Sequence, residues 1–368
     1  MNKKPINKKE VIRIFKSVKV SNNKIEIINL GNSINRILAE DIKSPINVPP
    51  FNNSAVDGYA IKNSDAGLKI RFKIIGKILA GENKKIYLKS GEAVRIFTGA
   101  KMPKNSKTVI MQENAIEKNG MVTFLKNPKK NQNCRLLGED ILKNQIVLKA
   151  GDVIKSNNQS ILASIGRNKI KVFKKLSVGF FTSGNELKNP GKNLSGSKIN
   201  NSNKYAISSL IKEIGFNVKN LGVLRDNEIE INKLIMRNIK NFDVIITTGG
   251  ASVGDEDHLI KTIKKIGILK FWKIAIKPGR PLGFGFIKNK AIICLPGNPV
   301  SVFLLFAMLV RPFLYKLAGS NWKEPKSIPG IVKFNMKKKT KRMEWLRVII
   351  DKAKSDKLLL KKYDRQGS

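Results

Sequence analysis

The second half of the chain alternates strand-like and helix-like segments, and this alternation constrains the fold more than any other feature. From residue 176 onward, apolar runs typical of strands, at 176–182, 217–224 and 242–248, are each followed by a segment with helical spacing of apolar residues. Strands that alternate with helices favour a parallel, doubly wound sheet. Such sheets bind ligands beyond the carboxyl ends of their strands, so the turns there are the expected place for a functional site.

The rest of the chain has a different pattern. Residues 6–20 and 157–166 have helical spacing, residues 44–60 contain three prolines and three asparagines, and residues 69–150 alternate short strand-like runs with polar turns. We therefore predict a multidomain fold of class α/β plus β. Its predicted parts are an N-terminal helical and linker domain (1–45 and 145–174), a β-rich inserted domain (46–144), a doubly wound α/β domain (175–318) and a C-terminal β domain (326–368). Residues 44–60 are predicted to form a structured loop instead of a helix or a central strand.

The chain is strongly basic, with 71 lysines and arginines against 27 acidic residues and a net charge of +44. One interpretation is compositional drift, since lysine, asparagine and isoleucine crowd every segment. The other is a nucleic-acid binder, but such proteins gather their basic residues on one face or in a tail. Here the basic residues are spread throughout, so we expect no specific nucleic-acid binding. We expect a positive field that suits small anionic ligands.

Scarce residue types exclude several kinds of site. His258 is the single histidine, and Cys134 and Cys294 lie far apart with no CxxC, so neither a histidine-rich metal centre nor a zinc site is indicated. A bound metal should instead be a hard, oxygen-liganded ion such as Mg²⁺. The longest apolar run, 300–310, is too short to span a bilayer, and the first ten residues lack the apolar core of a signal peptide. We expect a cytoplasmic protein without a membrane partner.

The stretch "DVIITTGGASVGDED" (243–257) joins an apolar strand to glycines and then to three acids. Thr247 to Gly250 are predicted to turn away from the sheet, and Gly249, Gly250 and Gly254 allow positive φ and a close approach of the backbone. Backbone N–H groups at the start of the next helix can hold an anion. The acids Asp255 to Asp257 could simply favour the helix dipole. Three of them beside a glycine turn favour a Mg²⁺ that bridges an anionic ligand.

Acids also follow two other strands of the predicted sheet. Glu186 comes just after the strand at 176–182, and Asp226 follows the strand at 217–224. A single acid at such a place is usually a solvated loop residue or a helix cap. Acids at three strand ends of one sheet converge on the same rim, which favours a shared site.

Basic residues mark the segment "FWKIAIKPGRP" (271–281). The segment is predicted to be the next strand, and period-two alternation then places Lys273, Ala275 and Lys277 on one face. An exposed edge strand with solvated lysines is the alternative. The turn "KPGRP" is predicted to aim Lys277 and Arg280, and "LPGNPVS" (295–301) makes another strand-to-helix turn, with Pro299 suited to the first turn of the helix.

Several of these stretches occur together in one known family. They are "SPINVPPFNNSAVDGYA" (44–60), "RIFTGAKMP" (95–103), "RLLGEDI" (135–141), "FTSGNEL" (181–187), "TTGGASVGDED" (247–257), "FWKIAIKPGRP" and "LPGNPVS". In this order they resemble the molybdopterin molybdenumtransferase family, which includes the MoeA proteins and the gephyrin E domain. "VPPFNNSAVDGYA" (48–60) separates this family from the molybdopterin adenylyltransferases, which look similar around "TTGG".

The resemblance implies an elongated four-domain chain that works as a homodimer, with a MogA-like α/β domain at 175–318. It implies that adenylylated molybdopterin is the substrate, and that AMP is released in the presence of Mg²⁺ while molybdate supplies the metal. The adenylyltransferase that makes this substrate is an implied partner. A molybdopterin adenylyltransferase is the nearest alternative function, and a non-catalytic scaffold of the gephyrin E-domain type is an alternative of another class.

The resemblance also assigns roles to individual residues. The implied catalytic residues are Asp57, Thr98, Glu186, Asp226, Asp257, Lys273 and Lys277, of which Glu186, Asp226 and Asp257 would hold the metal. The implied substrate-binding residues are Thr248, Gly249, Gly250, Ser252, Gly254, Pro296, Pro299, Ser301, Arg347 and Ser368. The family continues beyond the point where this sequence ends, so the chain is expected to be a fragment or a short member whose C-terminal β domain is incomplete.

Overall fold

The structure, a computed structural model, describes residues 4–19, 24–68, 70–250, 258–337, 342–354 and 357–366. The chain forms two compact units. Unit 1 comprises Met1–Glu40, Ala150–Lys155 and Ile170–Ser368, and unit 2 comprises Asp41–Lys149 and Ser156–Lys169. The four-domain division predicted from the sequence stays a prediction.

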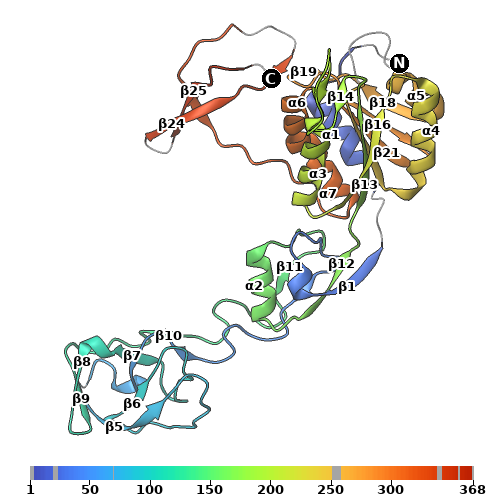
Figure 1. The fold of residues 1–368 in the computed structure, drawn as a ribbon. Helices are drawn as coiled ribbons and strands as arrows, with labels where there is room; N and C mark the ends of the chain where they lie inside the picture. Colours follow the sequence, from blue (N-terminus) through green and yellow to red (C-terminus); the bar gives the residue numbers. More distant parts are fainter. Residues whose placement is uncertain are drawn as a thin grey trace. The chain divides into compact units, whose positions relative to one another are not determined.

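Unit 1 is built around a six-stranded sheet (Figure 1). Its strand order is β16 (Asn217–Leu224), β13 (Ser177–Ser183), β17 (Val244–Thr248), β21 (Lys290–Leu295), β20 (Gly283–Ile287) and β18 (Ile268–Trp272). The first four strands are parallel, and β20 is antiparallel to both of its neighbours. The doubly wound α/β fold expected from the alternating pattern is therefore confirmed, although β20 and its reversal were not predicted.

Helices cover both faces of this sheet. One face carries α1 (Lys8–Ser17), α3 (Ser202–Glu213), α6 (Pro299–Leu305) and α7 (Arg311–Leu317), with the π-helical segment η5 (Phe306–Val310) between the last two. The other face carries α4 (Glu228–Asn238), followed by the short 3₁₀ helix η4 (Ile239–Asn241), and α5 (His258–Ile266). The two sets of helices lie on opposite sides of the strands in Figure 1.

The sheet is apolar on both faces because successive strand residues point in opposite directions. Phe180 packs with the α1, α3, α6 and α7 side, whereas Phe181, the next residue, packs against the α4 and α5 side. Ile246 and Ile245 divide in the same way. Central parallel strands that are covered on both sides require this pattern, and it explains why the strands read as continuous apolar runs.

The first helix of the chain joins the core formed by the last helices of the α/β fold. Phe15 of α1 is fully buried and stacks on Phe313 of α7, with ring centroids 4.3 Å apart. It also meets the edge of Phe284 in β20 at 5.0 Å. Residues Pro299–Leu317 form the one helical stretch among the described residues that is long and apolar enough to cross a membrane. Its Val302, Leu305 and Phe313 are fully buried in this core.

Several smaller pairings complete unit 1. They are β1 (Ile25–Asn29) with β12 (Lys169–Phe173), β14 (Leu187–Lys188) with β15 (Ile199–Asn200), β19 (Ile276–Lys277) with β23 (Met343–Glu344), and a three-stranded sheet of β22 (Gly330–Val332), β25 (Lys357–Lys362) and β24 (Val348–Lys354). The 3₁₀ helix η1 spans Leu30–Asn32. The β19–β23 pairing is parallel and joins the C-terminal segment to the α/β fold.

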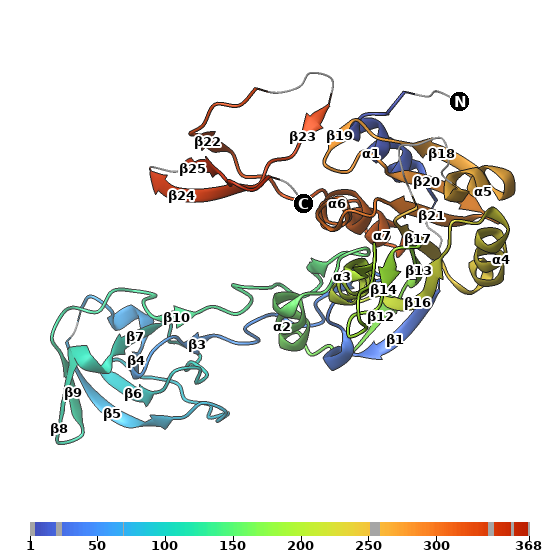
Figure 2. The same cartoon turned by 45° about the horizontal axis from the view of Figure 1, so that its top comes forward.

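Unit 2 is β-rich, as predicted (Figure 2). Its six-stranded sheet has the order β7 (Thr108–Met111), β4 (Gly58–Ile61), β6 (Glu92–Ile96), β5 (Arg71–Ile78), β9 (Met121–Phe124) and β8 (Ala115–Lys118). The pairs β3 (Asn53–Ser54) with β10 (Cys134–Arg135) and β2 (Ile42–Lys43) with β11 (Ile146–Leu148), helix α2 (Ser156–Ser164) and the 3₁₀ helices η2 (Asn63–Asp65) and η3 (Gln112–Asn114) accompany it.

Three predictions about local structure were wrong. Residues 58–60 were predicted to belong to a loop, but they lie in β4, between β7 and β6, where Tyr59 and Ala60 are buried. Thr247 and Thr248 were predicted to turn away from the sheet, but both are buried residues of β17. The segment 271–277 was predicted to be one strand, but β18 ends at Trp272 because Lys273 adopts a φ of 77°. The shared face of Lys273, Ala275 and Lys277 does not exist for that reason.

Candidate functional site

The order in which the chain adds parallel strands reverses at β13: the next strand, β16, lies on one side of β13, and the strand after it, β17, lies on the other side. Helix α3 connects β13 to β16 on one face, and α4 connects β16 to β17 on the opposite face. The carboxyl ends of β13 and β17 therefore form the topological switch point, where open α/β sheets bind ligands. Ser183 ends β13 and Thr248 ends β17.

Glycines allow the two strand ends to lie unusually close. Gly249 has a φ of 81°, and a Cβ atom there would overlap the carbonyl oxygen of Ser183. Gly250 has a φ of 63°, and its Cβ would lie 2.6 Å from Oγ of Ser183. Positive φ and backbone proximity both require glycine. The positive φ and close backbone approach predicted for Gly249 and Gly250 are thus present. The predicted site residues Ser252, Gly254 and Asp257 lie outside the described residues.

The switch point contains buried polar atoms that lack hydrogen-bond partners. Among the described residues, no partner is found for Oγ of Ser183, for Oγ1 of Thr247 and Thr248, or for Oδ1 of Asn203 at the start of α3. Asn203 uses its Nδ2 atom to donate to the carbonyl oxygen of Gly297 at 2.6 Å. An unpaired buried polar atom costs about 1–3 kcal/mol. These atoms are therefore suited to a bound polar ligand, to water or to the adjoining loop at 251–257.

Two of the predicted acids lie beside the switch point. The carboxylate of Glu186 folds back over Gly184, where a Cβ would come within 2.5 Å of both carboxylate oxygens. Asp226 accepts a hydrogen bond of 3.1 Å from Nδ2 of Asn185. Both acids are exposed. No group of three metal-binding side chains occurs within the described ranges, and Asp257, the third predicted ligand, lies outside them.

A cavity of about 360 Å³ opens between two turns that follow strands of the same unit. Its lining comprises Ile276, Lys277, Pro278, Gly279, Arg280, Pro281, Pro296, Gly297, Asn298, Ser301 and Arg342. The lining thus includes the predicted residues Lys277, Pro296 and Ser301. Gly297 also lies close to Gly249, since a Cβ on Gly297 would be 3.6 Å from Cα of Gly249. The cavity therefore adjoins the switch point.

The cavity is cationic and contains an unpaired donor. Lys277, Arg280 and Arg342 contribute positive charge to its lining. The Nε atom of Arg280 is buried and has no hydrogen-bond partner in the described part of the chain. On the opposite turn, Oδ1 of Asn298 accepts from the backbone N–H of Ser301 at 3.3 Å and begins α6, with Pro299 in its first turn. A guanidinium donor of this kind is chemically suited to a charge-assisted hydrogen bond with an oxyanion.

Lys277 has an acidic neighbour that the sequence did not reveal. Its Nζ atom lies 3.6 Å from Oε1 of Glu344, whose side chain is only 9% exposed, whereas that of Lys277 is 62% exposed. Lys273, by contrast, is not among the residues that line the cavity. Its backbone N–H donates to the carbonyl oxygen of Leu282 at 3.2 Å, and its Nζ lies 6.0 Å from the ring centroid of Trp272.

Unit 2 contains the remaining pair of predicted catalytic residues. The backbone N–H and the hydroxyl of Thr98 both donate to Oδ1 of Asp57, each at 2.7 Å. These two hydrogen bonds, with a smaller contribution from the charge of Arg95, hold the pKa of Asp57 below its usual value near 3.8. Arg95 lies over the rings of Tyr59 and Phe97, at 4.8 Å and 5.2 Å from their centroids. Asp57 therefore remains ionised to a lower pH than an ordinary aspartate does.

The predicted C-terminal residues are only partly described. Arg347 is half-buried, and its guanidinium lies 5.3 Å from the ring centroid of Tyr363. Its backbone N–H donates to Oε1 of Gln366 at 3.1 Å, and Nε2 of Gln366 donates back to the carbonyl oxygen of Arg347 at 2.8 Å. Ser368 lies outside the described residues.

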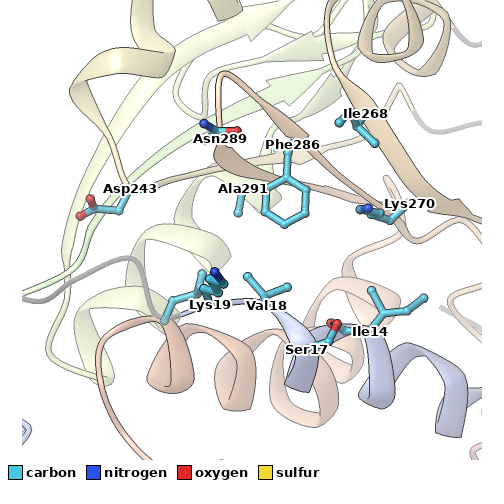
Figure 3. A pocket seen from close by; sticks show the side chains of 11 residues that line it. Ile14, Ser17, Val18, Lys19, Asp243, Ile268, Lys270, Phe286, Asn289 and Ala291 are labelled. Carbon is cyan, nitrogen blue, oxygen red and sulfur yellow. The ribbon is translucent and has the colours of Figure 1, made fainter.

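A larger cavity, of about 560 Å³, lies at the opposite edge of the sheet (Figure 3). It is lined by Asp243, just before β17, by Asn289, just before β21, and by apolar residues that include Val18 and Phe286. Because the ligands of parallel sheets bind at the carboxyl ends of strands, size alone does not make this cavity the functional site. Lys19 in its lining also precedes residues 20–23, which are outside the described part.

Sequence reasoning missed four residues of these sites: Asn203, Arg342, Glu344 and Arg95. Arg95 lies in the quoted stretch "RIFTGAKMP", so its position next to Thr98 was a usable signal. Glu344 becomes a neighbour of Lys277 only through the β19–β23 pairing. No local pattern in the sequence announces that pairing.

Comparison with protein families gives two adjacent matches. Residues 6–166 match the family model described as the MoeA N-terminal region, domains I and II. Residues 179–316 match the model described as a probable molybdopterin binding domain.

Individual relatives extend over most of the chain. A molybdopterin molybdenumtransferase from Haemophilus influenzae is 41% identical over 324 residues, which cover 88% of this chain and 80% of that protein. A molybdopterin molybdenumtransferase from Staphylococcus epidermidis is 35% identical over 322 residues, covering 86% of this chain and 77% of its own length. A crystal structure of a molybdopterin biosynthesis MoeA protein from Pyrococcus horikoshii has a TM-score of 0.71 and 33% identity, and covers 97% of this chain and 90% of that chain.

We predict that Gly249→Ala lowers the free energy of unfolding by more than about 1 kcal/mol, because alanine is strained at positive φ and its Cβ would meet the Ser183 carbonyl. Urea unfolding followed by circular dichroism measures the change. Gly99→Ala is the matched control: Gly99 has a φ of 80° but no atom within 4 Å of a Cβ. Equal losses of unfolding free energy in the two variants would show that the contact of the new Cβ with the Ser183 carbonyl adds no cost.

We predict that Thr98→Val raises the pKa of Asp57, because valine keeps the shape of threonine but removes one of the two donors to Oδ1. The ionised form of Asp57 stabilises the fold above the pKa of the unfolded chain, and this contribution is lost as the pH falls through the folded-state pKa. In the variant that loss begins at a higher pH. Titration of the ¹³Cγ resonance of Asp57 measures the shift, with exposed Asp364 as the internal control; an unchanged Asp57 titration contradicts the assignment.

Proposed function

Because the chain belongs to the molybdopterin molybdenumtransferase family, as its relatives and its fold establish, we propose that it inserts molybdenum into adenylylated molybdopterin and releases AMP. The resemblance found in the motifs is confirmed, and the protein is a transferase of molybdenum cofactor biosynthesis. The observation that carries the finer proposal is the cationic cavity beside the switch point, with the unpaired Nε atom of Arg280. We propose a cytoplasmic site of action.

The switch point is suited to the pyrophosphate of the substrate. Gly249 and Gly250 let the backbone approach a phosphate without steric hindrance, and the hydroxyls of Ser183 and Thr248 are buried donors without partners among the described residues. Hydroxyl and backbone N–H donors are typical of phosphate sites at the ends of strands. Thr248, Gly249 and Gly250, with Ser252 and Gly254, are thus the proposed phosphate-binding set.

The residues beside the switch point are chemically suited to Mg²⁺. Mg²⁺ prefers hard oxygen ligands and keeps several waters. Glu186 and Asp226 offer exposed carboxylates there, next to unpaired hydroxyl oxygens. Glu186, Asp226 and Asp257 are the residues that would hold the ion. When bound, it would neutralise phosphate charge and polarise the phosphorus toward attack.

The cavity between the turns is suited to molybdate. A tetrahedral oxyanion needs several donors in a small volume, and Lys277 and Arg280 supply positive charge from one turn while Ser301 lies across from them. We propose that Arg347 and Ser368 add donors from the C-terminal segment, that Pro296 and Pro299 shape the turn, and that Lys273 contributes positive charge for the leaving AMP. Asp57 and Thr98 are proposed to complete the acidic part of the site.

The two alternative functions are distinguishable. A molybdopterin adenylyltransferase would consume ATP and molybdopterin, and the match of residues 6–166 to the MoeA N-terminal region favours the transferase of molybdenum. A purely structural scaffold has no need for an ionised Asp57 held by two hydrogen bonds or for an unpaired Arg280 donor. Incubation with ATP and molybdopterin should give no adenylylated product.

We predict that the protein releases AMP from adenylylated molybdopterin in the presence of molybdate and Mg²⁺, and that Asp257→Asn reduces this release at least tenfold at limiting Mg²⁺. The reason is that an amide lacks the charge of a metal-bridging carboxylate. Mass spectrometry of the released AMP measures the reaction. Asp364→Asn, at an exposed acid outside the proposed site, is the control. Wild-type turnover by Asp257→Asn removes Asp257 from the proposal, and absence of AMP from the wild type removes the proposal itself.

We predict a homodimer with shared sites, as the family resemblance implies. Asp57 and Asp257 belong to different units of the chain, and each copy is proposed to supply Asp57 to the site of the other. An Asp57→Asn chain mixed with an Asp257→Asn chain should then regain a fraction of the wild-type activity, since one of the two sites keeps both acids. Light scattering establishes the dimer, and mass spectrometry of tagged chains establishes the mixed species. Mixed dimers without activity would contradict the sharing of sites.

A further inference from the structure

An acid lies at the edge of the proposed oxyanion cavity, where positive charge is expected. Glu344 belongs to β23, and the parallel register with β19 places it opposite Lys277. Its carboxylate is 3.6 Å from Nζ of Lys277, and its side chain is 9% exposed. Among the described residues Lys277 is the one ion-pair partner of Glu344. The pair therefore combines a largely buried acid with a largely exposed base.

The three cations of the cavity differ in whether an acidic side chain lies beside them. Within the described ranges, Arg280 and Arg342 have no acidic partner, whereas Lys277 has Glu344. An oxyanion that reaches Lys277 must compete with this carboxylate, because two anions close to one ammonium repel each other when they are poorly solvated. Glu344 is absent from the lining of the cavity. Its shortest route to a ligand in the cavity is therefore the ammonium of Lys277, 3.6 Å from its carboxylate.

The backbone around Glu344 is fixed, so the lysine is the partner that can move. The N–H of Met343 donates to the carbonyl oxygen of Ala275 at 2.9 Å, and the N–H of Trp345 donates to that of Lys277 at 2.8 Å. These bonds hold Glu344 between them. Lys277 carries its charge on a flexible four-carbon stem and is 62% exposed. Exchange of the ammonium between the carboxylate and a ligand requires only rotation of that stem.

We propose that Glu344 is a positioning residue that holds the ammonium of Lys277 while the cavity is empty and yields it to the incoming oxyanion. The inference rests on the proposed function, in that the ligand is molybdate or a similar tetrahedral dianion. Glu344 then sets the affinity of the site: it keeps Lys277 in place and limits how tightly any anion is held. A site that must bind molybdate and also release anionic products gains from this limit.

A different role for the pair is possible on the same geometry, and it makes the opposite prediction. If the ion pair only fastened β23 to β19, its removal would lower stability and would leave oxyanion affinity unchanged or weaker. If Glu344 competes with the ligand, its removal strengthens binding. Measured affinity for an oxyanion therefore separates the two roles, and stability alone does not.

The experiment is isothermal titration of the full chain with molybdate, repeated with sulfate, in the absence of molybdopterin. Glu344→Gln should bind molybdate roughly two- to fivefold more tightly than the wild type, the ratio expected for a partly exposed ion pair. Glu344→Asp keeps the charge and should stay close to the wild type. Glu324→Gln is the matched control, because it removes the same charge from an exposed acid whose partner is Lys16 at 3.9 Å, and it should leave the affinity unchanged.

A double-mutant comparison tests whether Glu344 acts through Lys277. Lys277→Met should weaken binding, and Lys277→Met combined with Glu344→Gln should bind no more tightly than Lys277→Met alone, because the ammonium for which Glu344 and the ligand compete is gone. Equal binding by wild type and Lys277→Met would remove Lys277 from the oxyanion site and contradict the proposed function. A weakened Lys277→Met with an unchanged or weakened Glu344→Gln, folded by circular dichroism, would contradict only the inference about Glu344.

Discussion

The close approach of β13 and β17 is the constraint on which the rest of the site depends. Gly249 turns directly against the carbonyl of Ser183, and no side chain fits between them. This contact lets the strand ends of one sheet, the first turn of α3 and the turn at Gly297 meet in one small region. Buried polar atoms of Ser183, Thr248 and Asn203 lack partners there among the described residues, and this supports the binding site proposed for the region.

The acidic and the basic residues of the site lie in two separate places. Carboxylates lie beside the switch point, on Glu186 and Asp226, and cations lie in the neighbouring cavity, on Lys277, Arg280 and Arg342. The strongly basic composition of the chain does not by itself create this arrangement, because Lys277 and Arg280 come from one turn and Arg342 is brought to it by the segment that begins β23. Glu344 is the exception on the cationic side, a largely buried acid 3.6 Å from Nζ of Lys277.

Local sequence patterns predicted the strands that are covered by apolar side chains on both faces. The apolar run at 242–248 contains β17 because both faces of that strand are covered, and the glycines at 249 and 250 were assigned from their place after a strand. The prediction failed at Lys273, where a positive φ ends β18, since a lysine gives no signal for such a backbone. It missed Glu344 because the partner of β19 is distant in sequence and only two residues long. Alternation rules describe a residue's neighbours along the chain, whereas these features depend on neighbours brought together by the fold.

The packing of the first helix has a consequence for how the chain is made. Phe15 leaves the ribosome early, but the rings that enclose it, Phe284 and Phe313, belong to segments synthesised much later. Contacts of such long sequence separation form slowly, and domains otherwise tend to fold from the N-terminus during synthesis. The strands of unit 2 are synthesised after α1 and before β20 and α7. Unit 2 can therefore complete its own sheet first. During that interval the apolar face of α1, with Val11, Ile12 and Phe15, has no partner to cover it, so a chaperone that shields such faces would find its target in this helix.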